Sequence, residues 1–149
     1  CGDGGISMLM GDLMTIAQYQ LPVKLVVFNN RTLGMVELEM QVAGIPDWQT
    51  KMLNPDFAGV AEACGIRGYN VTDPAKLENT LKTALVHDGP ALINVFTNPH
   101  VPTLPPHTSV GVMSRYVESQ ARMVLGGRMD EVWEAFKTNL KYIRDLKDR

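Results

Sequence analysis

Two short polar groups near the start of the chain contain the residues best suited to chemistry. Gly2-Asp3-Gly4-Gly5 places a carboxylate among small residues, and Asn29-Asn30 follows with 24 residues between Gly4 and Asn29. Small residues at the start of a helix let backbone N–H groups approach an anion such as a phosphate. A carboxylate, an amide oxygen and a backbone carbonyl form a hard oxygen set that suits Mg²⁺ held partly by a ligand's phosphates. We therefore expect Asp3 and Asn30 to face one crevice that holds Mg²⁺ and a phosphate-bearing ligand.

Two other phosphate-binding motifs are excluded by the residues around these groups. A P-loop needs Gly-Lys-Ser/Thr, which this sequence lacks. A dinucleotide-binding fingerprint wants an acidic residue at the end of the second strand, where this chain has Asn29-Asn30. Glycine turns alone are common in α/β folds, so the prediction depends on the pairing of the two groups.

The hydrophobic pattern predicts alternating helices and strands that place both groups at the ends of neighbouring strands. A nearly continuous apolar run over 23–28 is typical of a parallel strand buried on both faces. The helix predicted before it, over 6–19, has an inward stripe formed by Met8, Leu9, Leu13, Ile16 and Ala17. The further elements are helices over 35–42, 57–64 and 74–88, strands over 67–71 and 91–96, and a long loop over 43–55. This order predicts an α/β fold with a doubly wound, mostly parallel sheet, in which the carboxyl ends of the strands meet at one edge.

The composition changes after this α/β region. Residues 1–98 are predicted to form one domain, followed over 99–149 by a proline-rich linker and C-terminal helices at 110–125 and 129–146. The chain begins at Cys1 and reaches the glycine turn at once, without the strand that such a turn needs before it. We therefore expect a C-terminal piece of a longer polypeptide, with the first strand of the domain truncated.

The two polar groups and their surroundings resemble those of a known superfamily. Gly2-Asp3-Gly4, followed after 24 residues by Asn29-Asn30, resembles the thiamine-diphosphate motif of thiamine-diphosphate-dependent enzymes. The stretches 2–13, 26–40 and 126–139 are similar to the branch of pyruvate oxidases and quinone-linked pyruvate dehydrogenases. The resemblance covers almost the whole chain, and it implies that residues 1–98 are the C-terminal domain that binds thiamine diphosphate and Mg²⁺.

The resemblance also implies roles for individual residues. The metal ligands would be Asp3, the side chain of Asn30 and the backbone carbonyl of Thr32, and backbone N–H groups of the glycine turn would hold the diphosphate. Glu39 matches a catalytic glutamate near the reacting carbons, and the alternative is an exposed acid on a helix. Met35 stands where some relatives carry phenylalanine beside the cofactors, so we expect a pocket wall rather than an aromatic role in electron transfer. The cofactor-binding set is Gly2, Asp3, Gly4, Gly5, Asn30, Thr32 and Met35.

The activity that the resemblance implies is oxidative decarboxylation of pyruvate to acetate and CO₂, with electrons passing through FAD to a quinone. In this branch FAD is bound mainly by another domain. The glutamate that activates the aminopyrimidine comes from a pyrimidine-binding domain of a partner subunit. Because these active sites lie between subunits, a homo-oligomer is expected, at least a dimer and by resemblance a tetramer.

Three alternatives remain open at this point. Oxygen as the electron acceptor, with phosphate as co-substrate, is a variant within the same branch. Acetolactate synthase shares the domain but condenses 2-keto acids, and it tends to have a glutamine-glutamate pair where this chain has Gly11-Asp12. A non-catalytic module that only binds a magnesium diphosphate is the alternative from a different class.

Composition and charge restrict the other partners. The net charge of -2 and the pI near 5.9 give no reason to expect nucleic acid. No apolar run of about 18 residues is present, and no signal peptide is visible. The two cysteines, Cys1 and Cys64, form no disulfide framework, which is typical of a cytoplasmic protein with reduced thiols.

The predicted last helix carries an apolar stripe, with Lys and Arg residues off it. Such a helix can lie on a membrane surface, and bacterial quinone-linked relatives are thought to use their C-terminus for peripheral contact with the inner face of the cell membrane. We favour the alternative, in which the stripe packs on its own protein. Its members are Met129, Val132, Trp133, Phe136, Leu140 and Ile143.

Overall fold

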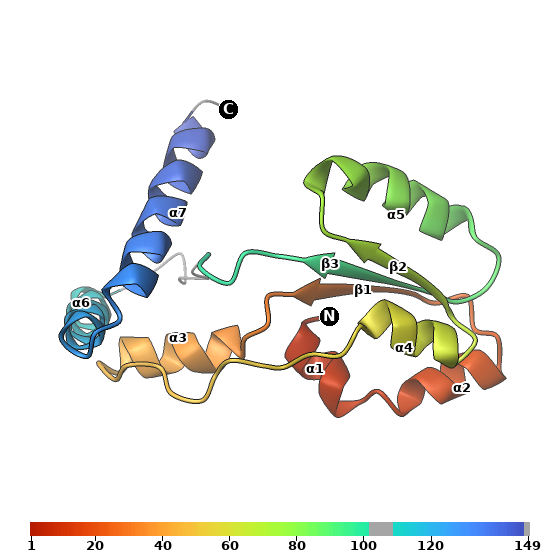
Figure 1. Cartoon of the computed structure of the whole chain (residues 1–149), viewed down its shortest axis with the longest axis horizontal. Helices are drawn as coiled ribbons and strands as arrows, with labels where there is room; N and C mark the ends of the chain where they lie inside the picture. Colours follow the sequence, from red (N-terminus) through yellow and green to blue (C-terminus); the bar gives the residue numbers. More distant parts are fainter. Residues whose placement is uncertain (102–108, 148–149) are drawn as a thin grey trace. The chain divides into compact units, whose positions relative to one another are not determined.

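The computed structural model describes residues 1–101 and 109–147 (Figure 1). Backbone contacts divide the chain into two compact units. The first consists of Cys1–Thr32 and Met52–Thr97, and the second of Leu33–Lys51 and Asn98–Arg149. The domain boundary predicted at residue 98 stays a prediction. Among the described helices, none combines the length and apolar character needed to cross a membrane.

The first unit alternates helices and strands, as the hydrophobic pattern predicts. Two of its helices begin at aspartates that cap them: the carboxylate of Asp56 accepts from the N–H of Ala58, and that of Asp73 from the N–H of Ala75. The elements are α1 Asp3–Met8, α2 Asp12–Gln18, β1 Lys24–Asn29, α4 Phe57–Ala63, β2 Arg67–Val71, the 3₁₀ helix η1 Pro74–Lys76, α5 Leu77–Val86 and β3 Ala91–Phe96.

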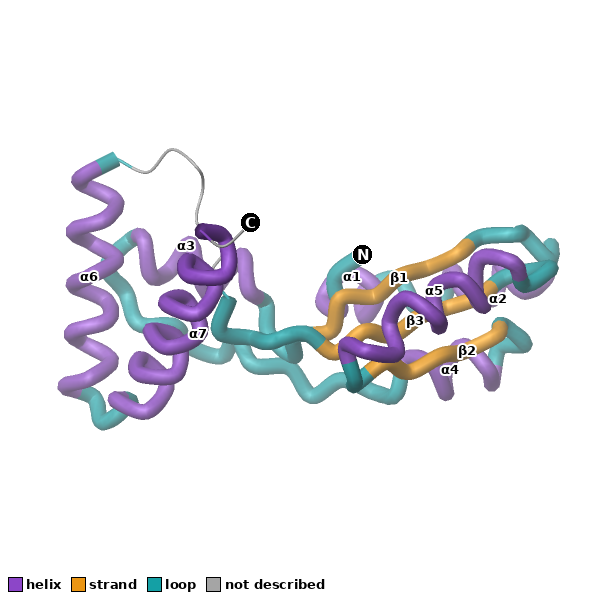
Figure 2. The backbone as a smooth tube through the Cα atoms, turned by 90° about the horizontal axis from the view of Figure 1, so that it is seen from above, coloured by secondary structure: helices purple, strands orange, loops and turns teal. Residues whose placement is uncertain are grey.

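The three strands form a parallel sheet in the order β1-β3-β2, with β3 in the middle (Figure 2). Lys24 pairs with Ala91 at one end of the β1–β3 pair, and Asn29 pairs with Phe96 at the other. Gly2 forms a further parallel bridge with Phe28, so the residues before α1 pair with the edge of β1 that β3 leaves open. These pairings confirm the predicted α/β fold with a parallel sheet and C-terminal helices.

Helices cover both faces of the sheet, and each face has its own apolar core (Figure 1). Successive strand residues point to opposite faces, so Val27 and Leu92 pack with α1, α2 and α4, whereas Ile93 and Val95 pack with α5. The burial of β1 is incomplete, because Phe28 is 57% exposed. Because helices pack on both faces of the sheet, the doubly wound arrangement predicted from the sequence is present in this unit.

A tight approach between α4 and β2 leads to one stability prediction. A Cβ on Gly68 would lie 2.3 Å from the backbone oxygen of Ala58, so a side chain here forces the helix away from the strand. We expect Gly68→Ala to lower the free energy of unfolding by about 1–3 kcal/mol, the usual cost of overpacking. Gly111→Ala is the matched control, because a Cβ there meets nothing within 4 Å. Equal thermal unfolding temperatures for the two variants would contradict the steric argument.

The second unit contains three helices: α3 Gly34–Val42, α6 Val110–Leu125 and α7 Met129–Lys147. Helix α6 packs against both α3 and α7. Its start is capped by Ser109, whose hydroxyl accepts from the N–H of Val112 at 3.3 Å. Leu38 of α3 and Met123 of α6 are buried in this unit.

An arginine at the start of α7 anchors the loop that follows α3. One guanidinium nitrogen of Arg128, Nη2, lies 2.9 Å from Oδ2 of Asp47 and 2.8 Å from Oε2 of Glu131. Nη1 donates to the backbone oxygen of Asp47 at 3.1 Å. Lys51 adds a second cation 3.2 Å from Glu131. This cluster fixes part of the loop predicted over 43–55 to the start of α7.

The same cluster gives a pH dependence of stability. Hydrogen bonds from Arg128 and Lys51 hold the pKa of Glu131 at about 2, well below its ordinary 4.5. A lowered pKa in the folded state stabilises the protein above the unfolded pKa, and this contribution is lost as the pH falls from about 4.5 toward 2. We expect Glu131→Gln to cost about 1 kcal/mol at pH 7, discounted for partial exposure.

Unfolding experiments over pH 2–7 test this expectation. The difference between the original protein and Glu131→Gln should shrink below about pH 4.5. Glu134→Gln is the control, because the ion pair of Glu134 with Lys137 is exposed. A difference that stays constant down to pH 2 would mean that the ion cluster does not stabilise the fold.

The single helix predicted over 6–19 is wrong, since the chain forms two helices, α1 and α2. The N–H groups of Leu9 and Asp12 bond to carbonyls three residues back, so a turn separates the helices. Gly11 lies in this turn, and glycine costs about 1 kcal/mol relative to alanine inside a helix. Leu13 packs into the core as predicted, but Met8 is 80% exposed and Leu9 65%.

The predicted apolar stripe of the last helix lies on α7 and is about half exposed. Trp133 and Phe136 stack with ring centroids 5.6 Å apart, and the ammonium of Lys137 lies 5.6 Å from the Trp133 ring centroid. Met129 and Leu140 are likewise exposed, and the Ile143 side chain is outside the described residues. Both roles considered for this stripe, packing and membrane contact, stay predictions.

Candidate functional site

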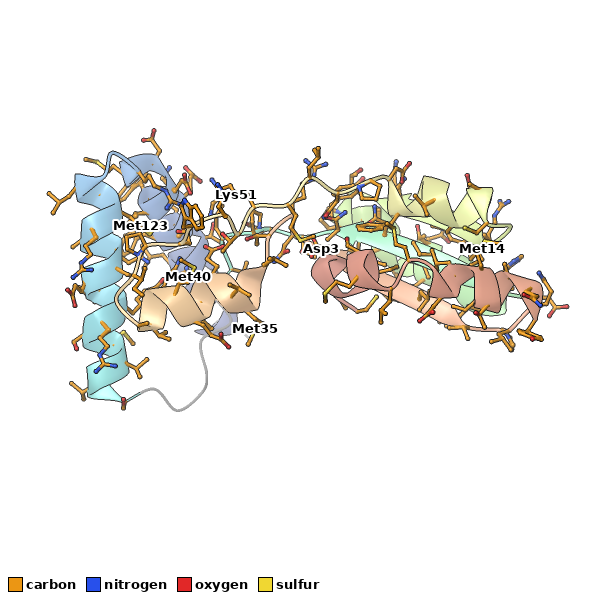
Figure 3. The ribbon with its side chains drawn as sticks, turned by 90° about the horizontal axis from the view of Figure 1, so that it is seen from below. Asp3, Met14, Met35, Met40, Lys51 and Met123 are labelled. Atoms are coloured by element: carbon orange, nitrogen blue, oxygen red, sulfur yellow. The ribbon has the colours of Figure 1, made fainter. Side chains whose placement is uncertain are left out.

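The carboxylate of Asp3 is buried at the start of α1, where Figure 3 labels it, and is 3% exposed. Its Oδ2 accepts from the backbone N–H of Arg31 at 2.8 Å and from the side-chain amide of Asn54 at 2.6 Å. Its Oδ1 accepts from the N–H of Gly4 at 3.0 Å. Each of these three partners is a neutral N–H group. Because none of them carries charge, the negative charge of Asp3 is held in place without being neutralised.

The chain turns sharply just after β1, at Asn30-Arg31-Thr32. The side-chain Oδ1 of Asn30 accepts from the N–H of Thr32 at 3.1 Å, and Thr32 is buried. Arg31 has a φ of 56°, a left-handed conformation that costs roughly 1–2 kcal/mol for a residue with a side chain. Strained residues of this kind cluster at functional sites.

Strand pairing brings the two polar groups together. The bridge between Gly2 and Phe28 places the first turn of α1 beside the end of β1. Asp3 then reaches the backbone of Arg31, the residue directly after Asn30. The juxtaposition expected from the order of parallel strands is therefore present in the first unit.

The residues at this place fit Mg²⁺ and a diphosphate. The donor set combines one carboxylate, of Asp3, with the neutral oxygens of the Asn30 amide and the Thr32 carbonyl. Mg²⁺ prefers such hard oxygens and usually shares its sphere with phosphates. Among the described residues no group of three or more His, Cys, Asp or Glu could hold a metal ion. A Cβ built on Gly2 or Gly5 meets nothing within 4 Å, which leaves room beside the backbone for a ligand.

Two of the predicted site residues lie in the second unit. Met35 is 63% exposed near the start of α3, and Glu39 is also exposed on that helix. Residues four apart lie on one face of a helix, so both side chains share a face of α3. Their predicted roles, a pocket wall and a catalytic acid, stay predictions.

Sequence reasoning missed the amides that surround Asp3. Asn54 donates to both Asp3 and Asn29, and Asn29 donates to Asn94. One signal was present: Asn94 interrupts the apolar run 91–96, and a polar side chain in a buried strand needs a partner. The second missed residue, Asn54, lies in a stretch predicted to be a loop, and the local sequence does not indicate that it contacts Asp3.

Comparisons with known proteins agree with this geometry. Residues 1–95 match the family model described as thiamine pyrophosphate enzyme, C-terminal TPP binding domain. The putative thiamine pyrophosphate-containing protein YdaP of Bacillus subtilis is 43% identical over 111 residues, covering 74% of this chain. The mitochondrial acetolactate synthase catalytic subunit of Aspergillus candidus is 38% identical over 114 residues, covering 70% of this chain.

One solved structure supports the same fold. The thiamine diphosphate-dependent 4-hydroxybenzoylformate decarboxylase of Rhodococcus jostii RHA1 superposes with a TM-score of 0.62 at 32% identity, over 65% of this chain and 19% of that one. The chain spans 19% of the length of YdaP and 15% of the Aspergillus enzyme. These proteins are thus much longer than the region that they share with the chain.

Proposed function

Because the chain belongs to the family of C-terminal thiamine-pyrophosphate-binding domains of thiamine-pyrophosphate enzymes, we propose that it binds magnesium thiamine diphosphate within an enzyme that oxidatively decarboxylates pyruvate. One observation carries the binding part of this proposal. A buried carboxylate, Asp3, is fixed against the turn at residues 30–32, beside open space at Gly2 and Gly5. The pyruvate part depends on sequence resemblance.

Each residue of the site has a distinct task in this proposal. Asp3, the Asn30 amide oxygen and the Thr32 carbonyl would hold Mg²⁺. The backbone N–H groups of Gly4 and Gly5 would hold the diphosphate. Thiamine diphosphate supplies, when bound, the reactive thiazolium carbon and the electron sink for decarboxylation. The chain's own contribution is therefore to anchor and orient the cofactor.

The pyruvate branch is favoured over condensation by details of the sequence. The stretches 2–13, 26–40 and 126–139 resemble pyruvate oxidases and quinone-linked pyruvate dehydrogenases. Gly11-Asp12 stands where acetolactate synthases tend to have glutamine and glutamate. In this proposal electrons pass through FAD to a quinone, FAD is bound mainly outside these 149 residues, and the enzyme is a homo-oligomer.

A second candidate function, acetolactate synthesis, is favoured by a separate observation. Several relatives are acetolactate synthases, among them isozyme 2 of Escherichia coli, whose large subunit is 38% identical over 96 residues. Such an enzyme would use the same site for Mg²⁺ and thiamine diphosphate. It would release no electrons to a quinone.

One assay separates the two. The natural polypeptide that contains this chain is supplied with Mg²⁺, thiamine diphosphate, FAD and pyruvate, and a soluble quinone analogue is followed together with the products. Quinone reduction with stoichiometric acetate is expected. Acetolactate without quinone reduction would overturn the pyruvate oxidation proposal and favour the synthase, and the cofactor-site assignment would survive.

A further inference from the structure

A continuous chain of side-chain hydrogen bonds crosses the first unit and ends at Asp3. It begins at Asp56, the capping residue of α4, and passes through four asparagines. The links are Asn70 Nδ2 to Asp56 Oδ1 at 2.8 Å, Asn94 Nδ2 to Asn70 Oδ1 at 2.8 Å, Asn29 Nδ2 to Asn94 Oδ1 at 3.1 Å, Asn54 Nδ2 to Asn29 Oδ1 at 2.9 Å and Asn54 Nδ2 to Asp3 Oδ2 at 2.6 Å. The central members, Asn29 and Asn94, are 2% and 0% exposed.

The two ends of this chain of hydrogen bonds restrict how its amides can be oriented. Asp3 and Asp56 are carboxylates, which accept hydrogen bonds and do not donate when ionised. A row of amides between two acceptors needs one amide that donates to both sides. Asn54 is that amide, and its buried Oδ1 has no hydrogen-bond partner among the described residues. The NH₂ group of Asn54 thus serves both Asp3 and Asn29.

The donors around Asp3 also distinguish its two oxygens. A carboxylate oxygen has about two lone-pair directions. Oδ2 uses both of its own, on the N–H of Arg31 and the amide of Asn54, whereas Oδ1 accepts from Gly4 alone among the described residues. Oδ1 is therefore the oxygen with capacity left for a cation.

We propose that Asn54 is a positioning residue that restricts Asp3 to one-oxygen binding of Mg²⁺, and that Asn29 and Asn94 hold Asn54 in place. This proposal rests on the proposed role of Asp3 as a metal ligand. A buried amide row is rigid because each member would be left unpaired if its neighbour rotated. One-oxygen binding suits the strict octahedral sphere of Mg²⁺, whereas Ca²⁺ accepts a two-oxygen carboxylate in a looser sphere.

The test measures dissociation constants for Mg²⁺ and for Ca²⁺, each in the presence of thiamine diphosphate, on the natural polypeptide that contains this chain. Asn54→Leu and the smaller Asn54→Ala remove the amide. Because hydrogen-bond partners of metal ligands typically contribute about 10- to 100-fold in affinity, Mg²⁺ binding is expected to weaken by that factor. Ca²⁺ binding is expected to weaken less, so that the preference for Mg²⁺ declines.

Asn94→Leu tests whether the more distant amides hold Asn54 in place. Among the described residues the Asn94 side chain bonds to Asn29 and Asn70 and not to Asp3 or residues 30–32, so its hydrogen bonds lead to Asp3 through Asn29 and Asn54. We expect the preference for Mg²⁺ over Ca²⁺ to decline in this variant too, by a smaller factor than in the Asn54 variants. Asn79→Leu, on the exposed surface of α5, is the control for the leucine substitution and should change neither constant. Thermal unfolding without cofactor reports whether each variant is folded.

The outcomes separate this inference from the proposed function. If Asp3→Asn binds Mg²⁺ and thiamine diphosphate normally, the proposed function fails. If Asp3→Asn loses binding while folded Asn54 variants keep both constants, the positioning role is overturned and the function stands. If the Asn54 variants lose Mg²⁺ and Ca²⁺ affinity equally and unfold at lower temperature, Asn54 is only structural and the inference is again overturned.

Discussion

Replacing Asp3 by asparagine is expected to abolish Mg²⁺-dependent binding of thiamine diphosphate while the protein stays folded. The substitution keeps the size of the side chain. Its remaining oxygen can still accept from Arg31 and Asn54, so the two hydrogen bonds at Oδ2 survive. The charge and the second oxygen are lost, and an NH₂ group points where the cation is proposed to bind. We expect a loss in affinity above about 100-fold, more than partners of metal ligands usually contribute.

The measurement is a titration of thiamine diphosphate at several Mg²⁺ concentrations, followed by calorimetry or by protein fluorescence. Asp12→Asn is the matched control, because Asp12 is likewise the first residue of a helix but is exposed. The control should bind as the original protein does. Normal binding by folded Asp3→Asn would remove Asp3 from the metal site, and with it the main support for the proposed function.

The elements that position Asp3 could be predicted from sequence because their signals are local. Runs of apolar residues with period two or 3.6 mark strands and helices, and Pro, Gly and capping Asp residues mark their ends. The strands over 67–71 and 91–96 and the helix over 110–125 have the predicted boundaries, and the helix predicted over 57–64 ends one residue earlier, at Ala63. The meeting of Asp3 with the turn after β1 was also predictable, since parallel strands bring their carboxyl ends to one edge.

Contacts between residues far apart in sequence could not be predicted from such local patterns. Asn54 reaches Asp3 across 51 positions, and Arg128 reaches Asp47 across 81. No periodicity encodes such pairs, because they depend on how packed elements present their loops. The break between α1 and α2 was missed for a related reason. An amphipathic pattern continues through Gly11, and only the observed backbone shows that a turn is formed there.

The glycine turn gives a test of the diphosphate site that does not depend on the metal ligands. A Cβ at Gly5 would meet nothing within 4 Å, so the free protein has room for a side chain at this position. The same room is where the proposed diphosphate would approach the backbone N–H groups of Gly4 and Gly5. A side chain at residue 5 should therefore leave the stability of the free protein unchanged and obstruct binding of the diphosphate.

We expect Gly5→Val to leave the thermal unfolding temperature unchanged and to weaken binding of magnesium thiamine diphosphate by about 10- to 100-fold, which corresponds to the loss of a hydrogen bond to a charged group. Gly11→Val is the control, because a Cβ at Gly11 also meets nothing within 4 Å and no ligand is assigned there. Both variants should unfold like the original protein, and only Gly5→Val should bind poorly. Equal affinities for the two would place the diphosphate elsewhere, since a branched side chain cannot share its volume with a phosphate.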